Sequence, residues 1–345
     1  MIKNMQLSIF DFLKQHPGFA MERIYFSTSP KTNELTAIRN AQPKHLLCSF
    51  ALWDGFTGRK REDRRERNFK NDLIDKIGYV PETIMLDSGA PTFHNNLLSA
   101  QQGKKLGRND IVDVKMDLLF EMYAEHFDYD DKAEAVAQQI LYDMYQLDIY
   151  ATYGQEVEKR APYDIERDLL TPFHRFYRFF MANRDYITHT VNLDIIGDSI
   201  QSRMAYEVLS HLGVNPIPVY GYKDDRLELK RYVEEGNQYI CLGGTAFGIS
   251  PKERIRWANE VASMYPEVKF HLLGTIDHYI ISRIKENVYS VDGTGWHLSA
   301  TFEKNRLEGE TIPEAAARNI LRISSYLKPD EGELLRTPID LEQIS

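Results

Sequence analysis

Short apolar runs recur along the chain, and each one ends at a glycine, an aspartate or another turn-forming residue. From position 189 onward these runs alternate with amphipathic segments, so that strand and helix follow one another to position 327. Such alternation is typical of parallel βα units, whose buried strands are continuous apolar stretches. The pattern predicts strands at residues 23–29, 45–52, 83–87, 189–196, 216–221, 238–244, 268–274 and 287–292.

Between residues 93 and 187 the pattern predicts no strand, so residues 94–187 are expected to form a mostly helical insertion between the third and fourth strands. Within it, acids recur every three or four positions opposite apolar residues, which indicates an amphipathic helix with a solvated acidic face. These acids are Asp110, Asp113, Asp117, Glu121 and Glu125. The later helices are expected at residues 199–212, 225–235, 251–265, 276–286 and 312–327.

Eight strands that each lead toward a helix suggest an α/β fold of the (β/α)8 TIM-barrel type, in one catalytic domain over residues 1–345. In that architecture the active site lies at the carboxyl ends of the strands. Asp87 and Asp292 end two of the expected strands, and Asp194 lies near the end of a third. Three acids converging on one rim would form a site, although a turn or helix-capping role explains each acid separately, and Asp198 competes with Asp194 for the exposed position.

The composition allows a full core and excludes several kinds of site. The chain has 345 residues, of which 43% are hydrophobic, and its net charge is −9. Residues 110–148 hold eleven acids and two bases, so the rest of the chain is neutral overall and a polyanionic partner stays possible. No long apolar run and no signal-peptide pattern occur, which favours a cytoplasmic protein without a membrane partner.

Metal and cofactor chemistry is not expected. The only two cysteines, Cys48 and Cys241, lie within apolar runs and are predicted to be buried. They are too few for a thiolate zinc site or an iron–sulfur cluster, and the histidines form no metal-binding pattern. We therefore expect no metal and no cofactor.

Taken in order, the strand-end motifs resemble those of the guanine transglycosylases, which exchange bases in transfer RNA, and of their relatives that act on DNA. The matching segments are Asp87-Ser-Gly-Ala90, Leu193-Asp194, Leu242-Gly-Gly-Thr-Ala-Phe-Gly248, Leu272-Leu-Gly274 and Val291-Asp292. The resemblance covers about residues 83–295 with one large insertion, and the Leu-Gly-Gly-x-Ala-x-Gly segment is its most specific part.

The resemblance implies a role for each matched residue. Asp292 would be the nucleophile, and Asp87 the general acid and base. Asp194 would bind the edge of the guanine base, and Leu273 would pack on its face. The remaining base-binding candidates at the strand ends are Ser88, Tyr220, Gly243, Gly244 and Thr245.

The departures from the family pattern indicate the DNA branch. The tRNA enzymes carry a zinc module near the carboxyl end, and this chain lacks its cysteines. Tyr220 stands where those enzymes have a base-binding glutamine. The resemblance therefore implies an enzyme like the phage and bacterial DNA-guanine transglycosylases, with DNA and a free 7-deazaguanine base, such as 7-cyano-7-deazaguanine, as substrates.

Other interpretations of the sequence stay open. They are a tRNA-guanine transglycosylase without zinc, a non-catalytic nucleic-acid-binding paralogue and a barrel hydrolase acting on a small phosphorylated molecule. DNA binding would need cations against the phosphates. The candidates are Arg59, Lys60, Arg61, Arg64 and Arg65 in one loop and Lys104 and Lys105 in the insertion. Since acids are interleaved in that loop, an ordinary solvated helix start explains it equally well.

Overall fold

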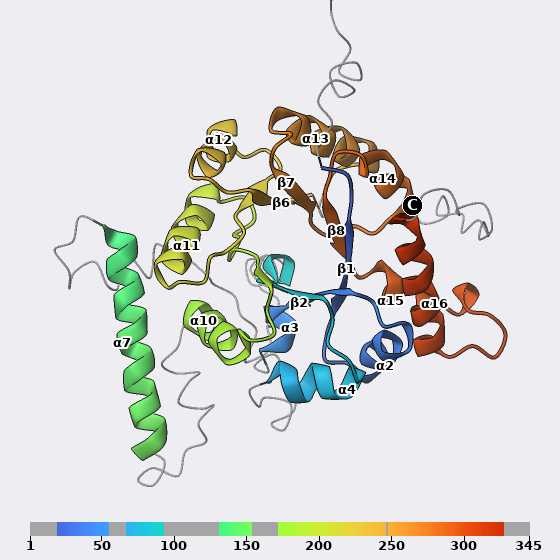
Figure 1. Ribbon diagram of the computed structural model, residues 1–345, viewed down its shortest axis with the longest axis horizontal. Helices are drawn as coiled ribbons and strands as arrows, with labels where there is room; N and C mark the ends of the chain where they lie inside the picture. Colours follow the sequence, from blue (N-terminus) through green and yellow to red (C-terminus); the bar gives the residue numbers. More distant parts are fainter. Residues whose placement is uncertain (1–18, 55–66, 93–130, 154–171, 246–247, 328–345) are drawn as a thin grey trace, which may run out of the picture.

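The chain is built around one curled sheet of eight parallel strands (Figure 1). The computed structural model describes residues 19–54, 67–92, 131–153, 172–245 and 248–327. The strand order is β4-β3-β2-β1-β8-β7-β6-β5, and every pairing is parallel. The strands are β1 (Arg23–Thr28), β2 (His45–Ser49), β3 (Thr83–Asp87), β4 (His189–Thr190), β5 (Val219–Gly221), β6 (Tyr239–Gly243), β7 (Lys269–Leu272) and β8 (Ser290–Gly293).

Helices surround the outer face of the sheet (Figure 1). In chain order they are α2 (Thr32–Ala41), α3 (Phe50–Trp53), η2 (Lys70–Ile74), α4 (Asp75–Ile77), α7 (Lys132–Tyr153), α10 (Pro172–Asn183), α11 (Ser199–His211), α12 (Arg226–Glu234), α13 (Pro251–Met264), α14 (His278–Ile284), α15 (Gly295–Thr301), η3 (Glu303–Asn305), α16 (Ile312–Ser324) and η4 (Ser325–Leu327). The predicted α/β fold with eight parallel strands is thus confirmed, and the arrangement is like a TIM barrel.

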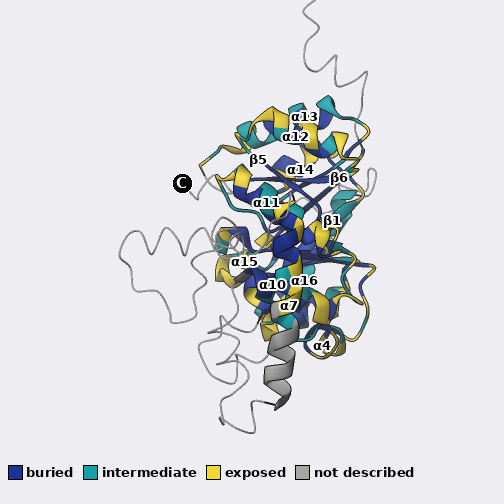
Figure 2. Cartoon of the chain, turned by 90° about the vertical axis from the view of Figure 1, so that its left-hand side faces the viewer, coloured by how far each residue is buried: buried dark blue, intermediate teal, exposed yellow. Residues whose placement is uncertain are grey.

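The strands separate two apolar layers because successive side chains point to opposite faces of a sheet. One layer lies inside the curl and consists of Tyr25, Leu47, Met85, Val191, Ile217, Val219 and Cys241. The other layer faces the helices and includes Phe26, Leu46, Leu86, Tyr220, Leu242 and Phe270. The strands are accordingly buried on both faces (Figure 2), as their continuous apolar runs require.

The two ends of the strand order, β4 and β5, meet at one point. An isolated parallel bridge pairs Val191 with Ile217. The amide of Ile217 donates to the carbonyl of Thr190 at 2.7 Å, and the amide of Asn192 donates to the carbonyl of Ile217 at 2.9 Å. Beyond this bridge the chain leaves the sheet, because the amide of Ile195 binds the hydroxyl of Ser202 instead of a strand.

Most of the predicted strands are shorter in the structure, and two of them illustrate the reason. The strand predicted at 45–52 ends at Ser49 and continues as the helical turn α3. The strand predicted at 189–196 is β4, which covers only His189–Thr190. Both differences arise at strand ends, where hydrogen bonds to nearby turns replace the pairing between strands.

Within its described residues, the predicted insertion, residues 94–187, contributes one helix to the ring around the sheet. Helix α10 packs Phe176 against Phe50 and Phe179 against Phe69, and it lies between α4 and α11 in Figure 1. Helix α7 lies outside that ring and contacts α11. The acidic stretch 110–125 lies outside the described residues. Across the ranges given above, no helix has the length and apolarity needed to cross a membrane.

Candidate active site

The ends of β3 and β8 and the segment after β4 bring Asp87, Asp292 and Asp194 together. The charges of Asp292 and Asp194 both raise the pKa of Asp87. Burial first, and then the charges of all three acids, raise the pKa of the Cys241 thiol. Cys241 belongs to the layer inside the curl, so the acids lie around its strand at the carboxyl end. The convergence expected from the strand-end pattern is therefore present in the structure.

Asp292, on β8, is held by three donors and is only 5% exposed. The Ser27 hydroxyl donates to Oδ2 at 2.7 Å, and the Gly274 amide donates to Oδ1 at 2.8 Å. Nε2 of His271 lies 3.2 Å from Oδ1. A carboxylate held by charge-assisted hydrogen bonds from separate strands has a fixed orientation.

The ionisation of Asp87 suits proton transfer. Burial, followed by the charge of Asp292, raises its pKa from 3.8 to about 7, although the Gly89 amide donates to Oδ2 at 2.9 Å and opposes the shift. Gly89 has a φ of 81°, and a Cβ there would lie 2.5 Å from Cβ of Ala51, so this turn requires glycine. A carboxyl that is half protonated near neutral pH can act as both acid and base.

Asp194 faces the same space from the segment after β4. Its Oδ2 lies 3.5 Å from the position of a Cβ built on Gly243, and Cδ1 of Leu273 lies 3.7 Å from that position. The Ser202 hydroxyl donates to Oδ1 at 3.1 Å, while burial and the charge of Asp224 raise the pKa of Asp194 to about 7. Its rival Asp198 instead caps α11 by accepting from the Gln201 amide at 3.0 Å.

Two of the base-binding candidates carry buried hydroxyls with unused hydrogen-bonding capacity. Oγ of Ser88 and Oγ1 of Thr245 have no hydrogen-bond partner within the described part of the chain. A buried polar atom without a partner costs about 1–3 kcal/mol, so a ligand that supplies the partner gains from it. Gly244, next to Thr245, has a φ of 71°, and a Cβ there would lie 3.0 Å from the Tyr222 amide.

Tyr220 does not belong to this group. The inward position on β5 is taken by Val219, so Tyr220 faces the helices, where it stacks on Trp257 with ring centroids 6.0 Å apart. Its hydroxyl donates to the carbonyl of Asp224 at 3.2 Å. The prediction that Tyr220 contacts a base at the carboxylates is therefore wrong, because the strand's alternation turns its ring outward.

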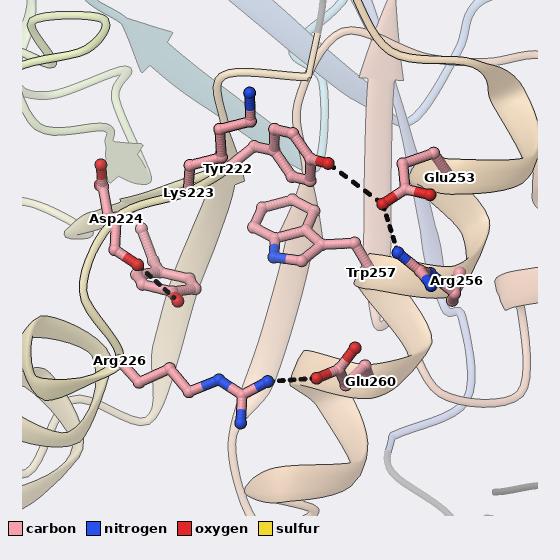
Figure 3. A pocket seen from close by; sticks show the side chains of 9 residues that line it. Tyr222, Lys223, Asp224, Arg226, Glu253, Arg256, Trp257 and Glu260 are labelled. Atoms are coloured by element: carbon pink, nitrogen blue, oxygen red, sulfur yellow. Dashed lines mark hydrogen bonds and ion pairs between the residues drawn. The ribbon is translucent and has the colours of Figure 1, made fainter.

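A surface pocket of about 240 Å³ lies where Tyr220 and Trp257 meet, between the segment after β5 and helix α13 (Figure 3). None of the three carboxylates lines it. Five of the polar side chains that line it are paired with one another: Glu253 accepts from Tyr222 at 3.0 Å and from Arg256 at 2.6 Å, and Arg226 binds Glu260. The pocket is therefore separate from the candidate site.

Besides Ser27 and Ser202, sequence reasoning missed two further polar residues around the carboxylates. His271 is fully buried and contacts Asp292, and the signal for it is a histidine between the two apolar residues of strand β7, Phe270 and Leu272. Arg254 donates to the carbonyl of Thr245. Burial lowers the pKa of Arg254, and the charge of Asp292 opposes this shift in part. The signal for Arg254 is a base in the first turns of the helix after Leu-Gly-Gly.

The cations predicted to bind nucleic acid, Arg59, Lys60, Arg61, Arg64, Arg65, Lys104 and Lys105, lie outside the described residues. Among the described residues, one exposed group has metal-ligand spacing and consists of Asp131, Glu134 and His211. Asp131 has a structural role there, because it accepts from the amides of Ala133 and Glu134 at the start of α7. This arrangement needs no metal to explain it.

Gly243 offers a test of how tightly the site is built. A Cβ at this position would lie 2.7 Å from Cγ1 of Val219, so Gly243→Ala is expected to cost about 1–3 kcal/mol of unfolding free energy. Val219→Ala removes the obstructing methyl groups. The double variant should therefore be more stable than the sum of the two single effects predicts, by about 1 kcal/mol in a double-mutant cycle of denaturant unfolding. Strict additivity would contradict the predicted contact.

The comparisons with known proteins add no identification: the chain matches no model of a protein family and no curated protein sequence. The resemblance to the guanine transglycosylases therefore rests on the strand-end motifs of the sequence.

Proposed function

We propose that the protein is a DNA-guanine transglycosylase that exchanges guanine in DNA for a 7-deazaguanine base. The observation that carries the proposal is the meeting of Asp87, with a pKa of about 7, and the firmly held Asp292 at the carboxyl ends of β3 and β8. We also propose that the curled sheet closes into a (β/α)8 barrel. The bridge between Val191 and Ile217 supports closure, because it links the two ends of the strand order.

Exchange without inversion at the sugar requires two displacements. In the first, an oxygen of Asp292 forms a bond to C1′ while the bond from C1′ to N9 of guanine breaks. The electron pair goes to the departing base, which takes a proton from Asp87. In the second, the incoming base gives its proton to Asp87 and attacks C1′, and the electron pair of the C1′–O bond returns to Asp292. No net proton is consumed.

The base would lie against Gly243 and Leu273, beside Oδ2 of Asp194. The N1–H and the exocyclic amine of guanine are donors, and the carboxylate of Asp194 supplies two acceptors for them. The unused hydroxyls of Ser88 and Thr245 are further polar contacts available to a ligand.

Asp194→Asn should weaken binding of the base because the amide nitrogen would face a donor of guanine. We expect the KM for labelled guanine to rise about 10-fold to 100-fold, with a smaller change in kcat. The matched control is Asp198→Asn, which keeps a good cap on α11 and should leave KM unchanged. Equal effects of the two substitutions would contradict the assignment of Asp194.

In duplex DNA the target nucleotide must be extruded from the stack before either carboxyl group can reach it. A cation beside the site would offset the repulsion between its acids and the phosphates of the strand. Arg254 donates to the carbonyl of Thr245 and interacts with the charge of Asp292, so it is in a position to supply this cation.

The test is incubation of the protein with duplex DNA, single-stranded DNA or transfer RNA and with labelled guanine or 7-deazaguanine bases. Nucleoside mass spectrometry then detects the exchanged base. We expect incorporation into DNA and none into transfer RNA. Incorporation into transfer RNA alone would identify the zinc-less tRNA enzyme, and incorporation into neither would overturn the proposal.

A further inference from the structure

A chain of buried polar groups leads away from Asp292 through the inside of the curl. His271 on β7 lies between Asp292 and Ser290, with Nε2 3.2 Å from Oδ1 of Asp292 and Nδ1 2.8 Å from Oγ of Ser290. Oγ of Ser290 lies 2.6 Å from the hydroxyl of Tyr239. His271 and Ser290 are both 0% exposed. Because both residues are buried, water does not compete for these hydrogen bonds.

The hydrogen bonds assign one tautomer to a neutral His271. Oδ1 of an ionised Asp292 only accepts, so Nε2 must carry the proton that joins them. Nδ1 then accepts from Ser290, and Tyr239 donates to Ser290. The rings of Tyr25 and Tyr239 meet the imidazole edge-on, with centroids 5.6 Å and 6.4 Å away, and hold its plane. All four polar groups are satisfied in this arrangement.

The donors are distributed unevenly over the two oxygens of Asp292. Oδ1 receives the Gly274 amide and His271, whereas Oδ2 receives the Ser27 hydroxyl. Oδ2 is thus the less engaged oxygen and the better placed to attack a carbon. Once Oδ2 is esterified, Oδ1 becomes an ester carbonyl, and the hydrogen bond from His271 to it loses its charge assistance.

We propose that His271 is a positioning residue that orients Asp292 for attack through Oδ2 and favours its release from the covalent intermediate. This inference rests on the proposed transglycosylase function. As the C1′–O bond breaks, its electron pair returns to the carboxylate and the bond from His271 regains strength. His271 therefore stabilises the free enzyme over the adduct, and its loss should make the adduct accumulate.

The adduct is measured by incubating the protein with end-labelled DNA and no added base, followed by denaturation and a count of label retained on protein. His271→Phe should raise the ratio of adduct to free enzyme about 10-fold. A hydrogen bond to a charged group is stronger than one to a neutral group by a free energy that corresponds to about this factor in an equilibrium constant. The exchange rate should fall by a similar factor. His271→Gln, which places an amide donor near the position of Nε2, should return both values toward the wild type. If His271 served only to pack the core, this substitution would not restore them.

Two further measurements keep the proposal testable if His271→Phe does not fold. Ser290→Ala removes the partner of Nδ1 and of the Tyr239 hydroxyl but keeps the contact between His271 and Asp292. It should change adduct and rate in the same direction by a smaller factor, so it replaces His271→Phe if that variant does not fold. Nitrogen NMR of histidine-labelled protein without substrate should show the Nε2-protonated tautomer for His271.

An Nδ1-protonated His271, or less adduct in His271→Phe than in the wild type, would overturn the proposal. Absence of any adduct or exchange in the wild type would overturn the proposed function and the inference with it. The Nε2-protonated tautomer together with an unchanged adduct level would overturn the inference alone.

Discussion

Replacing Asp292 by alanine is expected to abolish base exchange and the covalent DNA adduct together. Without a carboxylate oxygen at C1′ no first displacement occurs, and the loss of a catalytic nucleophile lowers kcat by about four orders of magnitude or more. Exchange is measured by incorporation of labelled guanine, and the adduct by label that stays with the denatured protein. Binding of DNA should persist, because the proposed contacts to phosphates would come from cations and not from this residue.

The alanine variant also leaves the Ser27 hydroxyl, the Gly274 amide and His271 without their acceptor. Asp292→Asn is therefore the better-matched variant, since its amide oxygen still accepts hydrogen bonds while its nucleophilicity is lost. The control is Asp277→Asn at the cap of α14, which should keep full activity because asparagine also caps helices. Undiminished exchange in Asp292→Asn would eliminate Asp292 as the nucleophile.

The sequence predicted the positions of the carboxylates well because local chemistry determines where a parallel strand ends. The bounds of β3 are those expected, and Asp87 ends it. Helices α11, α12 and α13 likewise begin at or beside the expected positions, because Asp198, Asp225 and Ser250 cap them with hydrogen bonds that their side chains make within the first turn. Such signals lie within a few residues of each boundary.

What the sequence could not predict depends on contacts between distant segments. His271 acquires its significance from Asp292 and Ser290 on the neighbouring strand. The early end of β4 depends on Ser202, which lies on the following helix and binds the Ile195 amide. Helix α10 joins the ring because its phenylalanines meet Phe50 and Phe69. In each case the deciding partner is identified only once the chain has folded.

Asp87→Asn is expected to remove exchange and, at the same time, to stabilise the folded protein at alkaline pH. The asparagine amide cannot deliver the proton that the departing base needs, so kcat should fall by about two to four orders of magnitude. The Gly89 amide can still donate to the asparagine oxygen, which preserves the turn after β3. A loss of activity with a gain of stability is the behaviour expected of a residue kept for catalysis.

The gain follows from the direction of the pKa shift. Because the folded state raises the pKa of Asp87 from 3.8 to about 7, the folded protein binds more protons than the unfolded chain within this window. The contribution of Asp87 to wild-type stability therefore falls as pH rises from about 4 to 7, and the asparagine variant lacks that loss. Allowing for the remaining solvent contact of the carboxyl, we expect Asp87→Asn to be more stable by about 2 kcal/mol at pH 8.

Urea unfolding at pH 5 and pH 8 checks this expectation, since the difference between the two proteins should be larger at the higher pH. Asp194 undergoes a similar shift in both proteins and so cancels from the comparison. A variant that is less stable than the wild type at pH 8 would show that Asp87 is ionised at little cost in the folded protein. It would then lack the proton that the first displacement requires.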